Sequence, residues 1–132
     1  IGCIHAGWKG VLSGIIENTI SKFKELKKNN QIVASVGPCI GKESYEVGKE
    51  FFQTFVSKSD FNDKFFVKKD NNKFLFDIRS CVINALSKNG VAEIDNVDLD
   101  TFKESDNFFS YRRSKKMGEE DYGRCISVIS LL

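Results

Sequence analysis

The feature that most constrains this fold is a change in the spacing of apolar residues within the first 38 positions. Residues 1–5, IGCIH, are mostly small or β-branched apolar residues and predict a buried strand. The two glycines of AGWKG predict a turn, and residues 11–26 then place apolar side chains at helical spacing. Residues 31–38, QIVASVGP, predict a second strand that ends at Pro38. A strand, a helix and a strand in succession indicate an α/β fold with parallel strands at this crossover.

The rest of the chain continues this alternation. A second helix is expected within residues 39–56, and a third at Asp77–Asn89, where Gly90 is placed for a left-handed C-terminal cap. The other expected elements are a strand and a turn at Asp70 to Asn72 within residues 65–78, a strand within residues 91–102, a long polar loop at residues 103–123 and a closing strand at residues 124–132. We therefore predict a single domain, residues 1–132, with a layered α/β sheet.

Composition excludes several classes of protein. Hydrophobic residues make up 41% of the chain and include 12 phenylalanines, which is enough for a hydrophobic core. The net charge of +2 is too close to neutral to indicate binding to nucleic acid or to a membrane surface. No apolar run reaches about eighteen residues, and no basic segment precedes an apolar run at the N-terminus, so neither a membrane span nor a signal peptide is expected.

The cysteines bear on the cellular location of the chain, and the first residue bears on whether it is part of a longer protein. Its four cysteines stand far apart, without a C-x-x-C pair, which favours free thiols in a reducing compartment: Cys3, Cys39, Cys81 and Cys125. A cytoplasmic location is the expectation. Because the chain starts on an apolar run rather than on methionine, we also expect it to be a piece of a longer protein.

His5, the only histidine, is the first candidate functional residue. It stands at the C-terminal end of the first predicted strand and precedes a helix, and α/β proteins bind ligands at this end of their strands. It could serve as a general base or a metal ligand, or it could be a core histidine bonded to a backbone carbonyl. A zinc site needs three or four protein ligands, and Cys3 could share a strand face with His5, although core packing is the simpler role for Cys3.

Two further stretches could carry chemistry. Cys39 lies in the glycine-bearing stretch GPCIGKESYEVG, where a depressed pKa would make it reactive, and a pair with His5 would resemble a hydrolase. A buried, inert cysteine is the alternative. The stretch NFFSYRRSKK combines aromatic rings with four cations, which could stack a base and bind phosphate. A solvated basic loop is the alternative there.

Five motifs occur in an order typical of one family: HAGWKG, GPCIG, YEVG, FFSYRR and a late GR before an apolar closing strand. On these motifs the chain resembles, nearly end to end, the C-terminal half of the bacterial multicopper polyphenol oxidase, or laccase-domain, proteins. These are related to the mammalian laccase-domain-containing protein. The resemblance implies a three-layer α/β/α sandwich with a mixed sheet, present here as a partial domain.

The resemblance also implies a function: zinc-dependent purine nucleoside phosphorylase with adenosine deaminase activity. His5 would be one of three zinc ligands, and the other two would belong to a half of the protein that this sequence does not contain. His5 and Arg112 would be catalytic, and Tyr111, Arg112 and Arg113 would bind the substrates, a purine nucleoside and phosphate. Of the two arginines, one is expected to face the crevice and the other an acidic residue. A homo-oligomer is left open.

Three departures and two rival functions accompany this interpretation. Lys9 stands where the family has arginine, Asp100 stands where it has cysteine, and the link between the arginine pair and GR is longer. Copper, the metal of the family's older description, fits poorly because a blue-copper site needs two histidines. The rivals are a cysteine-dependent hydrolase or peptidoglycan-editing factor, and a catalytically inactive fragment.

Overall fold

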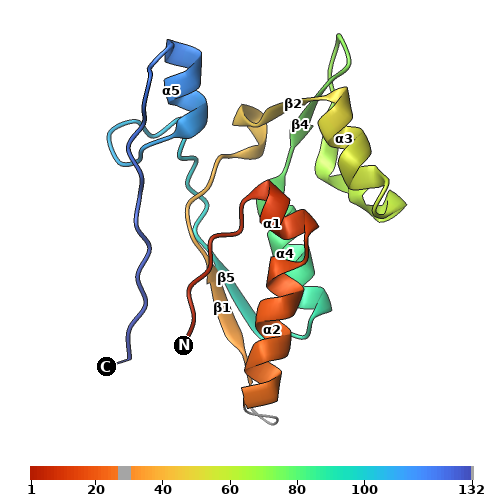
Figure 1. Cartoon of the computed structure of the whole chain (residues 1–132), viewed down its shortest axis with the longest axis vertical. Helices are drawn as coiled ribbons and strands as arrows, with labels where there is room; N and C mark the ends of the chain where they lie inside the picture. Colours follow the sequence, from red (N-terminus) through yellow and green to blue (C-terminus); the bar gives the residue numbers. More distant parts are fainter. Residues whose placement is uncertain (27–30, 132) are drawn as a thin grey trace.

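A computed structural model describes residues 1–26 and 31–131 of the chain. The helices are α1 (Trp8–Leu12), α2 (Ile15–Leu26), α3 (Lys49–Val56), α4 (Ile78–Lys88) and α5 (Tyr111–Met117), with two 3-10 turns, η1 (Lys42–Ser44) and η2 (Asp60–Phe65). The strands are β1 (Val33–Val36), β2 (Glu46–Gly48), β3 (Phe66–Lys68), β4 (Lys73–Phe76) and β5 (Glu93–Asn96). Figure 1 shows β1 and β5 beside α2 and α4, with α5 and both chain ends on the opposite side. None of the described helices is long and apolar enough to cross a membrane.

The parallel pair in this fold is β1 with β5, in the register Val33↔Glu93 to Val36↔Asn96. Helix α4 contacts both strands, and α2 packs on α4. The sides of the strands turned to these helices carry Ala34, Val36 and Ile94, which pack against the core. The other side carries Ser35, which donates a hydrogen bond to Asp95 at 3.3 Å. One face of this pair is therefore apolar and packed against the helices, and the other is exposed and, apart from Val33, polar.

The antiparallel sheet has the strand order β2-β4-β3. The turn predicted at Asp70 to Asn72 is confirmed: it joins β3 to β4 through Asn71 and Asn72, which take φ angles of 57° and 56°. Asparagine tolerates this left-handed conformation better than most residues do. Parallel and antiparallel pairing thus both occur, and the predicted α/β class is confirmed.

A cluster of aromatic rings fills the space between α3 and the antiparallel sheet. Phe76 is fully buried and Phe55 is 1% exposed. Their ring centroids lie 4.7 Å apart, and the Phe52 and Phe74 rings stack at 4.2 Å. Buried aromatic pairs at these separations add dispersion and quadrupole attraction to the hydrophobic gain. Most of the phenylalanines noted in the sequence serve this core.

Helix α4 agrees closely with the predicted helix at Asp77–Asn89. The Asp77 carboxylate accepts a hydrogen bond from the Ser80 backbone N–H at 2.9 Å, which caps the N-terminus. Gly90 follows the helix with a φ of 79°, as expected for a left-handed C-terminal residue. Both ends of this helix are therefore determined by local chemistry.

The other predicted helices need correction. The first is two helices, because Gly14 takes a φ of 81° between α1 and α2. Part of the second is a 3-10 turn and a strand: η1 covers Lys42–Ser44, β2 covers Glu46–Gly48, and the α-helix begins only at Lys49. The stretch predicted as a polar loop contains α5, which Ser110 caps and Gly118 ends with a φ of 76°.

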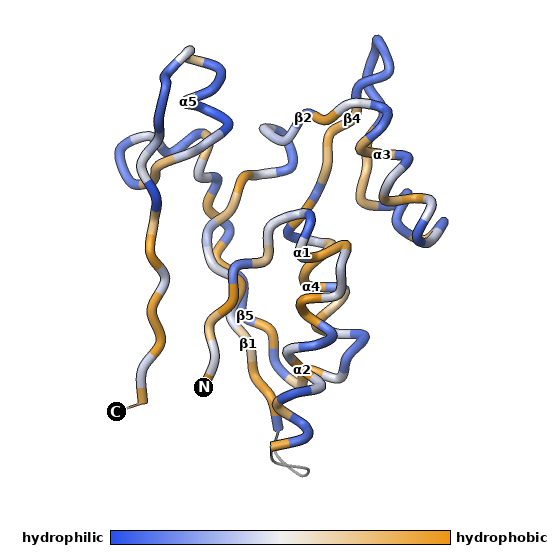
Figure 2. Tube along the Cα trace, in the orientation of Figure 1, coloured by the Kyte–Doolittle hydropathy of each residue, from blue (hydrophilic) through white to orange (hydrophobic). Residues whose placement is uncertain are grey.

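The strands predicted at residues 1–5 and 124–132 are also wrong within the described residues, which end at residue 131. Both segments are extended but form no ladder there. They lie side by side (Figure 1), and the Cys3 thiol donates a weak hydrogen bond to the Ser127 carbonyl at 3.6 Å. Figure 2 shows apolar stretches along the C-terminal segment. Strand-forming composition cannot make a strand without a neighbour in register.

Candidate active site

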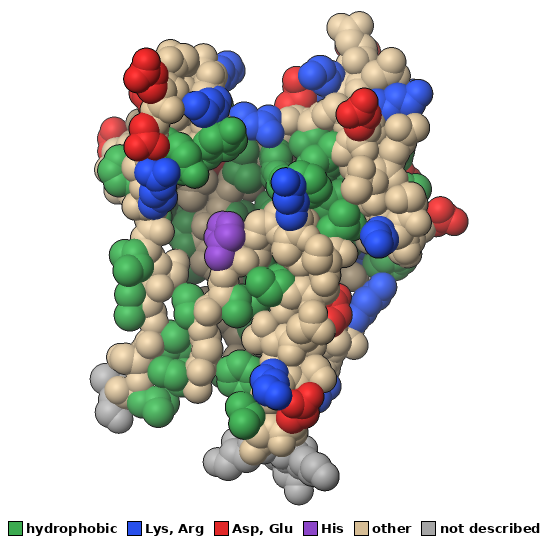
Figure 3. Space-filling model, viewed as in Figure 1, with side chains coloured by type: hydrophobic (Ala, Val, Ile, Leu, Met, Phe, Trp, Pro, Cys, Tyr) green, Lys and Arg blue, Asp and Glu red, His purple; other side chains and the backbone are tan. Residues whose placement is uncertain are grey.

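His5 lies in the extended segment before α1, and its side chain is exposed. Figure 3 shows it on the face between α1 and the C-terminal segment. Its ring lies close over Gly7, where an added Cβ would stand 3.0 Å from the histidine Nε2. The alternative of a buried core histidine is therefore wrong, and the imidazole is open to a ligand.

Trp8 anchors the segment that carries His5. Its ring lies 4.8 Å from the ring of Phe51 on α3, centroid to centroid. The Phe51 ring lies 6.0 Å from that of Tyr45, which immediately precedes β2. The motifs HAGWKG and YEVG, far apart in the sequence, therefore contact one aromatic cluster. Lys9, the departure from the family's arginine, is exposed with its Nζ 5.5 Å from the Trp8 ring centroid.

Arg112 brings a third motif to this cluster. Its Nη1 donates to the Glu46 carbonyl at 2.5 Å, and its guanidinium carbon lies 5.2 Å from the centroid of the Tyr45 ring. Tyr45 is buried, and burial raises the pKa of its phenol although the Arg112 charge acts in the opposite direction. The arginine is thus held over a neutral aromatic ring, a favourable position for a cation.

Arg113 turns away from Arg112 and binds backbone carbonyls. It donates to Thr101 at 2.7 Å, to Phe102 at 2.9 Å and to Phe108. Its partners are therefore carbonyl oxygens of the loop after β5, rather than the acidic residue expected from the sequence. The two arginines do differ in role: Arg113 fastens α5 to that loop, and Arg112 reaches the aromatic cluster.

Tyr111 lies beside the late GR motif. It is 57% exposed, and its ring meets that of Tyr122 edge-on at 5.0 Å. The Arg124 guanidinium carbon lies 4.3 Å from the Tyr122 centroid. A side chain at Gly123 would overlap the Phe109 ring, so this position needs glycine. These contacts join FFSYRR to GR. Phe109, Tyr122 and Arg124 line an open pocket beside α5.

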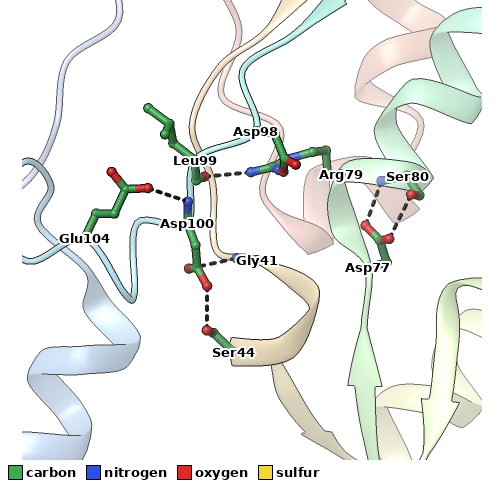
Figure 4. A network of polar contacts seen from close by, with 9 residues as sticks. All are labelled: Gly41, Ser44, Asp77, Arg79, Ser80, Asp98, Leu99, Asp100 and Glu104. Atoms are coloured by element: carbon green, nitrogen blue, oxygen red, sulfur yellow. Dashed lines mark hydrogen bonds and ion pairs between the residues drawn. The ribbon is translucent and has the colours of Figure 1, made fainter.

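Asp100, which in the sequence is only a departure from the family pattern, lies at the centre of a polar network (Figure 4). Its carboxylate accepts from the backbone N–H of Gly41 at 2.9 Å, the backbone N–H of Phe102 at 2.9 Å and the Ser44 hydroxyl at 2.6 Å. Partial burial opposes its ionisation, but these hydrogen bonds together hold the pKa of Asp100 below its ordinary value.

The sequence feature that could have indicated this network is Gly41, the second glycine of GPCIG. A Cβ at Gly41 would stand 2.6 Å from the Asp100 carboxylate, so only glycine lets the loop approach this closely. The sequence contained the glycine, but its partner is far along the chain, and nothing local indicates it.

Cys39 does not have the properties predicted for a nucleophile. Its backbone pairs with that of Asp100 in an isolated parallel β-bridge, and the Cys39 carbonyl accepts from the Thr101 N–H at 3.0 Å. Burial raises the pKa of its thiol, although the nearby Arg79 acts in the opposite direction. A raised pKa is the opposite of what a reactive thiolate needs, so an inert cysteine, here partly buried, is the better interpretation.

The predicted zinc site can be built only in part from these residues. Within residues 1–26 and 31–131, no three histidine, cysteine, aspartate or glutamate side chains gather as metal ligands do. His5 offers one imidazole, and Cys3 is exposed on the same segment. Because zinc takes three or four protein ligands, the described residues do not fit a complete zinc site, and we derive no chemical step through the metal.

Comparison with known proteins establishes the family. The sequence model described as multi-copper polyphenol oxidoreductase laccase matches residues 1–132, and the chain belongs to this family. It is 37% identical over 118 residues to a purine nucleoside phosphorylase of Rickettsia prowazekii, covering 89% of this chain and 49% of that protein. It is 36% identical over 118 residues to the purine nucleoside phosphorylase YfiH of Escherichia coli, covering 89% and 47%.

Two crystal structures share the fold. A Neisseria meningitidis protein of this family superposes with a TM-score of 0.72 at 31% identity, over 83% of this chain and 44% of its own. A Bacillus licheniformis YfiH protein superposes with a TM-score of 0.73 at 25% identity, over 84% and 43%. This chain therefore spans about half the length of the relatives it matches.

Proposed function

We propose that this chain contributes to a purine nucleoside phosphorylase. The observation that carries the proposal is the convergence of three separate motifs on one aromatic cluster, through Trp8, Tyr45 and Arg112. The names of the relatives point to the same activity. In phosphorolysis a phosphate oxygen attacks the sugar carbon, the bond to the purine nitrogen breaks, and the products are the free base and the sugar 1-phosphate.

Arg112 is the residue of this chain that we assign to phosphate. A phosphorylase must hold a dianion beside the sugar, and a planar guanidinium can bind two phosphate oxygens at once. The Glu46 carbonyl and the Tyr45 ring fix one side of Arg112. Fixing the side chain before substrate binds lowers the entropy lost on binding. Tyr111, exposed at the start of α5, is assigned to the purine, on which its ring could stack.

Zinc and adenosine deamination are the finer parts of the proposal. His5 is proposed as one zinc ligand, with the remaining ligands supplied from outside the described residues. The exposed imidazole supports this role, since a ligand nitrogen must be accessible. We expect the 132-residue chain alone to retain little or no zinc after dialysis, and stoichiometric zinc would contradict this expectation.

The test is phosphate-dependent release of free base from inosine and adenosine, followed by chromatography, with ammonia release measured in parallel. It should be run on this chain and on a protein of the relatives' full length that contains it. In the active form, His5→Ala should abolish turnover, and Arg112→Lys should raise KM for phosphate about tenfold through loss of a two-point contact. Lys22→Ala, on the exposed face of α2, is the control and should change neither constant.

The rival functions give different results in the same assay. Base release without a phosphate requirement, abolished by Cys39→Ser, would favour the cysteine hydrolase and overturn the phosphorylase proposal. Activity of the longer protein, with none from the 132-residue chain, would identify the chain alone as an inactive fragment. Inactivity of both on every purine nucleoside would overturn the proposal.

A further inference from the structure

We propose that Asp100 is a positioning residue that holds Arg112 over the Tyr45 ring. It does so from both sides, through Ser44 on one and through Phe102 and Arg113 on the other. The proposal rests on the proposed function only in assigning phosphate to Arg112. Hydrogen bonds connect Asp100 to the Arg112 site by two routes, which together form a closed circuit of contacts. Each of these contacts can be tested without measuring enzymatic turnover.

The first half of the circuit runs through the loop after β1. The Asp100 carboxylate accepts from the Ser44 hydroxyl at 2.6 Å and from the Gly41 N–H at 2.9 Å. Ser44 ends η1 and is followed directly by Tyr45, whose ring Arg112 faces. The carboxylate therefore fixes the backbone from which the Tyr45 ring and the Glu46 carbonyl project.

The second half runs through the turn that Asp100 begins. The same carboxylate accepts from the Phe102 N–H at 2.9 Å, which shapes this turn. The carbonyls of Thr101 and Phe102 then accept from Arg113. Because Arg113 is the third residue of α5, these bonds set the position of the helix whose second residue is Arg112.

The Asp100 carboxylate takes three hydrogen bonds from two loops. Its Oδ1 accepts from both backbone N–H groups, and its Oδ2 accepts from the Ser44 hydroxyl. A hydroxyl can also accept, so an asparagine could keep all three contacts by donating from its NH₂ group to Ser44. Asp100→Ala removes both oxygens and is therefore the substitution that breaks the circuit.

The first experiment follows Arg112 directly by NMR. Its guanidinium lies 5.2 Å from the Tyr45 centroid, so the ring current should displace its side-chain resonances, which Arg112→Lys serves to assign. Asp100→Ala should remove most of that displacement while the amide signals of α4 stay in place. Asp95→Ala, at an exposed aspartate on β5, is the matched control and should leave the displacement intact. An unchanged Arg112 displacement in Asp100→Ala would overturn the proposal.

Ser44→Ala protects the test against misfolding of the first variant, because it removes a single bond of the circuit. It should reduce the displacement of the Arg112 signals partly, with the spectrum otherwise native. A native spectrum with full displacement in Ser44→Ala, when Asp100→Ala does not fold, would also overturn the proposal.

Kinetics of the active form separate positioning from general stabilisation. Asp100→Ala should raise KM for phosphate about tenfold, as expected for loss of one charge-assisted contact, and change kcat less than about threefold. Equal KM values for the variant and the native protein would contradict the positioning role. If the protein shows no phosphorolysis, the proposed function fails, and the NMR result still decides whether Asp100 positions Arg112.

Discussion

Two apolar regions of this molecule have opposite environments. In the aromatic cluster between α3 and the antiparallel sheet, Phe76 is 0% exposed and Phe55 is 1% exposed. In the C-terminal segment, Ile126 is 87% exposed and Val128 is 78% exposed. Figure 2 shows both regions as hydrophobic in composition. The difference teaches that apolar sequence predicts a tendency to be buried, while burial itself depends on the neighbours that the fold supplies.

The largest expected effect comes from truncating the centre of the aromatic cluster. Phe76→Ala should lower the free energy of unfolding by about 3–5 kcal/mol, because it removes a fully buried ring and leaves a cavity. Urea unfolding followed by circular dichroism measures this change. Phe109→Ala is the matched control: the same substitution at a ring that is 60% exposed should cost less than about 1 kcal/mol. Equal losses of unfolding free energy in the two variants would contradict the contrast between the buried cluster and the exposed ring.

Thiol labelling should reveal the same contrast. Cys81 is 7% exposed, and burial, with a smaller effect of nearby carboxylates, raises its pKa to about 11. Its reaction with iodoacetamide at pH 8 should be about 100-fold slower or more than at exposed Cys125, because it requires local opening and a rare thiolate. The rate at Cys81 should keep rising with pH towards about 11. Mass spectrometry of digests gives both rates, and urea should abolish the difference.

A smaller loss of stability is expected when the N-terminal caps of α4 and α5 are removed. Asp77 caps α4, which contributes several buried side chains to the core, and Asp77→Ala should cost about 1 kcal/mol. Ser110 caps the seven-residue α5 through a longer hydrogen bond of 3.4 Å, so Ser110→Ala should cost about half as much. Asp77→Asn, which keeps an acceptor, is the control and should change stability least. A larger loss from Ser110→Ala would show that α5 stabilises the fold more than its contacts indicate.

The smallest effect is expected in the C-terminal segment. Ile126→Ser should change the free energy of unfolding of this chain by no more than about 0.5 kcal/mol, because so little of the side chain is buried. The measurement is the same urea titration. A loss above about 2 kcal/mol would mean that the segment is covered in solution, as in an oligomer, and would sharpen the comparison by identifying a buried surface.

The sequence by itself determined those elements whose causes are local. Helix α4 begins at an aspartate that caps it and ends before Gly90, and the turn between β3 and β4 uses two adjacent asparagines. The position of His5 before a helix was likewise evident from the glycines that follow it. Capping bonds and left-handed turns depend on residues a few positions apart, so the sequence contains the whole interaction.

Only the tertiary structure decided which distant segments meet. It paired β1 with β5, left residues 1–5 and 124–131 without a ladder, and brought Asp100 to Gly41 and Ser44. It also gave the two adjacent arginines different partners: Arg113 binds loop carbonyls, and Arg112 lies over the Tyr45 ring. Strand pairing and hydrogen bonds of this kind join groups far apart in the chain. Their free energy depends on how the whole chain packs, and no short stretch of sequence contains both partners.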